Sequence, residues 1–107
     1  MKLTQKEKGV IDDLALRYRA EFGAERVVLY GSAARGTMDR ESDIDLLIVL
    51  PSVDWEIEKR IGSLAFDAGL EIDRVISTLC FSVNDLENSP MRSSPLVHAI
   101  WREGVAL

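Results

Sequence analysis

VLYGSAARGTMDRESDIDLLIVL, residues 28–50, is the stretch that decides the fold. Two apolar runs, rich in β-branched and aromatic side chains, predict strands at residues 26–30 and 43–50. Gly31-Ser32 follows the first strand directly and turns the chain into a short helical segment at residues 33–35. A polar loop then leads to the second strand. The stretch therefore predicts two buried strands joined by a short connection that is almost entirely polar or turn-forming.

Two carboxylates lie at the start of the second predicted strand. Residues two apart in a strand point to the same face, so Asp43 and Asp45 project together while Ile44 enters the opposite side. Two carboxylates at such a short distance repel each other, and each raises the pKa of the other unless a cation lies between them. Carboxylate and phosphate oxygens are the ligands that Mg²⁺ prefers. The pair therefore predicts a magnesium site.

The Gly31-Ser32 turn is suited to binding an anion. Glycine lets the backbone approach a bulky group, and amides at the start of a helix offer donors where the helix dipole favours negative charge. Ser32 adds a hydroxyl donor. Together with the carboxylates, the turn would hold a phosphate between protein donors and metal ions, which favours in-line displacement at phosphorus with two-metal assistance.

The whole arrangement resembles the signature of the nucleotidyltransferase superfamily related to DNA polymerase β. Ten residues separate Ser32 from Asp43, and the Ala34-Arg35-Gly36 and Ser42 positions are similar to the minimal bacterial and archaeal members. The resemblance covers almost the whole chain and implies a single nucleotidyltransferase domain over residues 1–107. It also implies that Gly31 and Ser32 contact a nucleoside triphosphate, and that Asp43 and Asp45 bind two Mg²⁺ ions.

Two arginines lie close enough to the predicted site to be considered. Arg35 would reach a phosphate, although a surface or carboxylate-pairing role explains it equally well. Arg40, in the polar loop, has a weaker claim because loop arginines are normally solvated.

Active members of that family present a third carboxylate from the next strand, as metal ligand and as base toward the attacking hydroxyl. Asp73 is the only acidic residue in the third predicted strand, residues 72–81, and we predict it as this third ligand. Counting back from the polar segment at residues 82–87 instead favours Ser77, about 13 Å away at roughly 3.3 Å per residue. In that alternative Ser77 replaces the carboxylate, and the domain binds nucleotide with weak or no transfer.

The remainder of the chain predicts helices packed against one sheet. Capping and stop signals define helices at residues 5–22, 55–68 and 95–103, the second of them ended by Gly69. Residues 84–94 are polar and predict a loop with at most one helical turn. The order of elements indicates a small α/β (α+β) domain with a mixed sheet, consistent with the DNA polymerase β-like fold that the resemblance implies.

Composition limits the functional classes. A chain of 107 residues with 47% hydrophobic content suits one compact domain, without a membrane span or signal peptide, so we expect a soluble cytoplasmic protein. The net charge of −5 argues against a free-standing nucleic-acid binder. Cys80 has no partner in the sequence for a disulfide, and we expect it to be buried in a strand.

The resemblance implies an enzyme that transfers AMP from ATP to a hydroxyl and releases pyrophosphate. Proteins similar to this one are often encoded beside a HEPN-domain protein, as the antitoxin of a toxin–antitoxin pair that can add AMP to a tyrosine of the HEPN toxin. We therefore expect a HEPN partner, and a homodimer is compatible with so small a domain. Alternatives are an inactive nucleotide- or partner-binding module, a small-molecule nucleotidyltransferase, and a metal-dependent hydrolase, which leaves the Gly-Ser turn unexplained.

Overall fold

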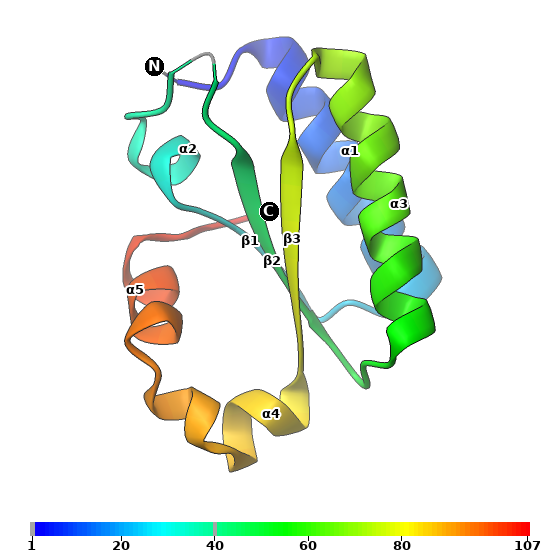
Figure 1. Cartoon of the computed structure of the whole chain (residues 1–107), viewed down its shortest axis with the longest axis vertical. Coiled ribbons are helices and arrows are strands. Elements are labelled where there is room, and N and C mark those ends of the chain that lie inside the picture. The colour runs from blue at the N-terminus through cyan, green and yellow to red at the C-terminus, as the bar shows by residue number, and fades with distance from the viewer. Residues whose placement is uncertain (1, 40) are drawn as a thin grey trace.

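A four-stranded mixed sheet forms the centre of the structure (Figure 1), a computed structural model that describes residues 2–39 and 41–107. The strand order is β3-β2-β1-β4. β1 is antiparallel to both of its neighbours, whereas β2 and β3 are parallel. The strands are β1 (Arg26–Tyr30), β2 (Ile44–Leu50), β3 (Ile76–Ser82) and β4 (Val105–Ala106). The predicted mixed α/β architecture is confirmed.

Helices cover both faces of the sheet. The two long helices, α1 (Gln5–Phe22) and α3 (Trp55–Ile72), lie side by side on one face (Figure 1). α5 (Pro95–Glu103) covers the other face, and α4 (Val83–Asn88) with the short 3-10 helix Pro90–Ser93 connects β3 to it. α2 (Ser32–Arg35) is a single turn between β1 and β2. The result is a three-layer arrangement with a separate apolar core on each side of the sheet.

The alternation of side chains along β2 divides the two cores. Ile44, Leu46, Ile48 and Leu50 are buried in the core formed with α1 and α3. Leu47 and Val49 instead pack in the core on the α5 side. Because successive residues of a strand face opposite ways, Asp45 shares the α5 side with Leu47. The sheet itself therefore decides on which face the carboxylate lies.

α1 begins and ends where the sequence predicts. Thr4 and Glu7 form the capping box, and Gly23 ends the helix in the left-handed conformation. The buried hydroxyl of Tyr18 donates a hydrogen bond to the backbone carbonyl of Ile61 at 2.8 Å, which joins α1 to α3.

The end of α3 differs from the prediction. The helix continues through Gly69 to Ile72, and β3 begins only at Ile76, so the predicted strand start at residue 72 is wrong. Gly69 does not stop the helix: a Cβ there would overlap the carbonyl oxygen of Arg74, and glycine lets the returning chain pass close to the helix. Asp73 ends the helix instead, in the left-handed conformation at φ 53°.

Replacing Gly69 by alanine tests this reading of the helix end. The new Cβ would push against the Arg74 backbone, and we expect a loss of about 1–3 kcal/mol in the free energy of unfolding by urea denaturation. Gly62→Ala is the matched control in the same helix, because its added Cβ would meet nothing within 4 Å apart from its own stretch of helix. That variant is expected to gain about 0.5–1 kcal/mol from helix propensity. Equal effects at the two positions would contradict the close approach.

Three smaller differences concern the second half of the chain. The predicted loop at residues 84–94 contains α4 and the 3-10 helix, because Ser82 and Asp85 form a second capping box. β4 was not predicted and consists of two residues paired with β1. Cys80 is only partly buried in β3, where burial raises the pKa of its thiol to about 11.

No helix in the described part of the chain is long and apolar enough to cross a membrane.

Candidate functional site

The Gly31 turn and the start of β2 meet at one end of the sheet. β1 ends at Tyr30, which pairs directly with Asp45 of β2, and Ser32 begins α2 immediately after the turn. Asp45 is half-buried and Asp43 is exposed. The structure thus places Gly31 and the two aspartates at one end of the sheet, and Ser32 follows Gly31 directly in α2.

Gly31 is in direct contact with one of these carboxylates. Its backbone lies at φ 73° and ψ −153°, a region that only glycine adopts without strain. A Cβ at this position would lie 2.6 Å from Oδ2 of Asp45. Glycine is therefore required twice, by the conformation of the turn and by the carboxylate that packs against it.

The two carboxylates leave the site with unbalanced negative charge. Burial raises the pKa of Asp45, Asp43 raises it further, and Arg35 offsets only part of the rise. Burial also raises the pKa of Tyr30, and the neighbouring Asp45 adds to that rise. A cation bound between the aspartates would relieve this repulsion.

The pKa of Asp45 predicts how stability depends on pH. A raised pKa in the folded chain means that protonated Asp45 stabilises the fold below the ordinary pKa of aspartate, and this contribution is lost as the pH rises through the raised value. Asp45→Asn is therefore expected to raise Tm at about pH 7 by roughly 1–4 °C, which corresponds to at most about 1 kcal/mol for a domain of this size. The gain should shrink toward about pH 3, where wild-type Asp45 is protonated.

Differential scanning calorimetry in chelator, at both pH values, measures this difference. Asp67→Asn, at an exposed aspartate of α3, is the control and should leave Tm almost unchanged. If the rise in Tm of Asp45→Asn is the same at both pH values, the rise does not come from the charge of Asp45.

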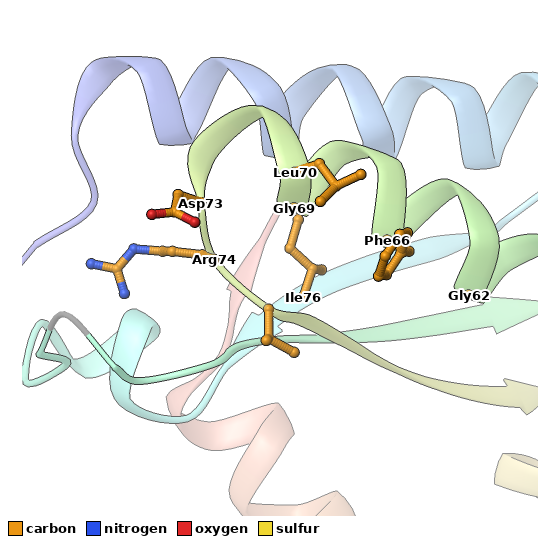
Figure 2. Close-up of a pocket in the computed structure, with 8 residues that line it drawn as sticks. Gly62, Phe66, Gly69, Leu70, Asp73, Arg74 and Ile76 are labelled. Carbon is orange, nitrogen blue, oxygen red and sulfur yellow. The ribbon is translucent and has the colours of Figure 1, made fainter.

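Ser77, and not Asp73, lies beside the aspartate pair. In the parallel pairing of β2 with β3, Asp45 is opposite Ser77, and the Ser77 hydroxyl donates a hydrogen bond to Oδ2 of Asp43 at 3.4 Å. Asp73 ends α3, which packs on the opposite face of the sheet, and it lines a groove with Phe66 and Leu70 (Figure 2).

The structure therefore corrects the prediction that Asp73 joins the pair. That prediction depended on a strand beginning at Ile72, but the helix occupies this position. Within residues 2–39 and 41–107, no three His, Cys, Asp or Glu side chains are grouped so as to hold a metal ion. The residue of β3 beside the pair is Ser77, as in the alternative that counts back from residues 82–87.

Arg35 has the carboxylate-pairing role considered for it, and its contact with a phosphate stays a prediction. Its exposed guanidinium forms an ion pair with Glu103 of α5 at 3.6 Å, and its charge also acts on Asp45. An exposed pair of this kind contributes little to stability, at most about 1 kcal/mol, so the side chain is free to exchange partners. Arg40 lies outside the described residues.

A turn immediately before Asp43 was not predicted from the sequence. The Asp39 carboxylate accepts hydrogen bonds from the Glu41 amide at 2.9 Å and from the Ser42 hydroxyl at 3.1 Å. These bonds hold the pKa of Asp39 below its ordinary value. Arg74 donates to the carbonyl oxygens of Asp39 and Ser42. The Asp-x-x-Ser spacing signals such a turn, whereas the contact with Arg74 joins residues more than 30 positions apart and has no local signal.

Fold and site together define the class of domain: a mixed sheet that presents a Gly-Ser turn against paired aspartates. Residues 11–101 match the family model described as "Nucleotidyltransferase domain". The chain belongs to the nucleotidyltransferase domain family.

The chain is similar to one curated relative and to solved structures. It is 40% identical over 58 residues to the "Putative protein adenylyltransferase MJ0141" of Methanocaldococcus jannaschii, a match that covers 53% of this chain and 59% of that protein. The chain thus spans about three fifths of this relative's length.

Two crystal structures share the fold at 20% sequence identity. One is of a toxin–antitoxin with AMP-PNP, with a TM-score of 0.63 over 96% of this chain and 72% of the matched chain. The other is of a mutant of the toxin–antitoxin MntA-HpeT, with a TM-score of 0.60 over 94% of this chain and 70% of the matched chain. At this identity the likeness shows the nucleotidyltransferase fold.

Proposed function

We propose that this chain is a single minimal nucleotidyltransferase domain, residues 1–107, that binds ATP with a divalent cation and transfers AMP to a hydroxyl group of a partner protein. The observation that carries the proposal is the contact between the Gly31 turn and the Asp45 carboxylate. This contact supports the proposal because it brings the Gly31 turn and one member of the carboxylate pair together. Family membership and the adenylyltransferase name of the M. jannaschii relative support AMP as the transferred group.

The donor set fits one divalent cation. Mg²⁺ is commonly bound by one or two carboxylates together with phosphate oxygens, and Asp43 and Asp45 would provide those carboxylates. When bound, the ion supplies positive charge that offsets the charge of the triphosphate. A two-ion site needs a third carboxylate, and none joins the pair among the described residues. We therefore propose one resident cation in place of two.

The remaining groups would orient the nucleotide. We propose that Ser32 and the amides of the Gly31 turn bind the triphosphate, and that Arg35 exchanges Glu103 for a phosphate oxygen. Transfer forms a bond between the acceptor oxygen and the α-phosphorus and breaks the bond from that phosphorus to the oxygen bridging to the β-phosphate. Pyrophosphate leaves, and the acceptor proton passes to solvent or to a base of the acceptor protein.

The acceptor is proposed to be a tyrosine of a HEPN-domain toxin, with this chain as the antitoxin. The solved structures with the same fold are toxin–antitoxin assemblies, one of them with AMP-PNP. The large apolar side chains of Trp55, Phe66 and Leu70 are largely exposed on α3, which favours assembly with a protein. A homodimer would cover the same kind of surface, and the mass of the purified chain by light scattering separates the two.

Label transfer tests the proposal. The chain is incubated with α-labelled ATP and Mg²⁺, with and without the HEPN protein encoded beside it, and Asp45→Asn serves as the inactive control. We expect label on a partner tyrosine, located by mass spectrometry, with release of pyrophosphate and no label in the control. Absence of label and of pyrophosphate with a partner that binds stably would overturn the transferase proposal.

The serine beside the aspartates favours a second candidate, a module that binds nucleotide and partner without efficient transfer. Ser77 lies opposite Asp45, where we propose that active relatives have their third carboxylate. Ser77→Asp would restore a carboxylate there, and we expect transfer to rise by about tenfold, part of the roughly 10²–10⁴ that general base catalysis contributes. Ser77→Asn is the matched control of similar volume. A rise in both variants, or in neither, would contradict a role for the missing carboxylate.

A further inference from the structure

Arg74 is a buried cation at the junction of α3 and β3. Only 6% of its side chain is exposed, and its Nε donates to the carboxylate of Glu7 on α1, itself 10% exposed. Figure 2 shows the Arg74 side chain extending away from Phe66, although Arg74 also lines the groove beside α3. Burying a charge is unfavourable unless it is paired and hydrogen-bonded, so this arrangement is expected to hold a fixed geometry.

The Glu7 carboxylate serves two partners at once. Its Oε1 accepts the Thr4 amide at 2.8 Å as part of the capping box, and its Oε2 accepts from Arg74. Burial raises the pKa of Glu7, but the Thr4 amide and Arg74 outweigh this and hold the pKa below its ordinary value. The capping box of α1 thus provides a rigid support for the guanidinium.

The other end of the guanidinium holds the turn that precedes Asp43. Nη1 of Arg74 donates to the carbonyl oxygen of Asp39 at 2.9 Å and to that of Ser42 at 3.1 Å. The next residue on the approach to β3, Val75, accepts the amide of Ile44 at 2.9 Å. Asp43 therefore lies between two backbone groups that are fixed to residues 74–75.

We propose that Arg74 is a positioning residue for the cation site, setting Asp43 through the backbone carbonyls of Asp39 and Ser42 and transmitting the fixed geometry of the α1 capping box. The inference rests on the proposed function only in assuming that a cation binds at Asp43. The positioning of Asp43 by Arg74 does not depend on that cation. Arginine suits this task because its planar donors reach Glu7 and both carbonyls together. A lysine at the same position would present one flexible ammonium and cannot reproduce that fork.

Two variants test the proposal while keeping the fold. Arg74→Lys retains the charge, and Glu7→Gln retains the capping-box acceptor while removing the charge of the pair. Arg17→Lys, at an exposed arginine that pairs only weakly with Glu21 at 3.4 Å, is the matched control. The readouts are Mn²⁺ affinity by electron paramagnetic resonance, and amide hydrogen exchange in the peptides that contain residues 41–46, both measured well below Tm.

We expect Arg74→Lys to weaken Mn²⁺ binding by about tenfold or more, the scale of a lost charge-assisted hydrogen bond. Exchange in residues 41–46 should be faster by a similar factor, while exchange in β1 and in the control variant stays at the wild-type rate. Glu7→Gln should shift both readouts in the same direction. Wild-type exchange and wild-type affinity in a folded Arg74→Lys would overturn the proposal. If the wild-type chain itself binds no Mn²⁺, the proposed function fails, and the exchange rates still decide the positioning role.

Discussion

Replacing Asp43 by asparagine is expected to lower nucleotidyl transfer by about 10²–10³-fold, the scale of losing one preorganised group that stabilises charge in the transition state. The substitution keeps the size of the side chain and its bond to Ser77, but removes half of the carboxylate pair. Asp43 is exposed, so Tm should stay close to that of the wild type. The measurement is the initial rate of pyrophosphate release with ATP, Mg²⁺ and the partner protein.

The control for this prediction is an aspartate outside the site. Asp67→Asn changes an exposed residue of α3 and should retain the wild-type rate. If Asp43→Asn keeps more than about a tenth of the wild-type transfer rate, the Asp43 carboxylate does not bind the cation that contacts the reacting phosphate.

The second large effect is expected for Gly31→Ala. The added Cβ would lie 2.6 Å from Oδ2 of Asp45, so the carboxylate must rotate away or the turn must open. Misplacing a reacting group by about 1 Å costs roughly 10²-fold in rate, and we expect a loss of that order. The unfavourable backbone conformation should also cost about 1–3 kcal/mol in the free energy of unfolding.

Gly23→Ala separates these two effects. Gly23 also has a positive φ, 67°, but it ends α1, and its added Cβ meets only Pro51 at 3.7 Å. It should lose stability and keep full transfer activity per folded molecule. If Gly31→Ala behaves in the same way, the contact between the turn and Asp45 has no functional role.

Local signals explain which parts of the fold were predictable. The Thr4 and Glu7 capping box and the glycine at residue 23 define α1 by interactions within a few residues. The run of β-forming residues just before Gly31 likewise predicts β1 with the bounds that the structure shows. The alternation around Ile44 also predicted that the two aspartates lie on the face opposite Ile44, and Ile44 is buried in the core with α1 and α3.

The rest depended on contacts between distant residues. Glycine after a helical pattern predicts a stop, yet Gly69 is inside α3 because the returning chain at Arg74 passes against it. This one difference moved Asp73 from a strand to a helix end. The alternative that counted back from the segment after the strand gave the correct neighbour, Ser77. The contact of Arg74 with the turn before Asp43 has no counterpart in local sequence patterns.

The most direct test of the central claim is calorimetric titration of ATP into the purified chain, in Mg²⁺ and in chelator, for the wild type and for the double variant Asp43→Asn with Asp45→Asn. If the Gly31 turn and the aspartate pair form one nucleotide site, the wild type binds ATP at least about tenfold more tightly with Mg²⁺ than without it, and the double variant loses that dependence. Equal ATP affinity in Mg²⁺ and in chelator, or an unchanged Mg²⁺ dependence in the double variant, would contradict the account.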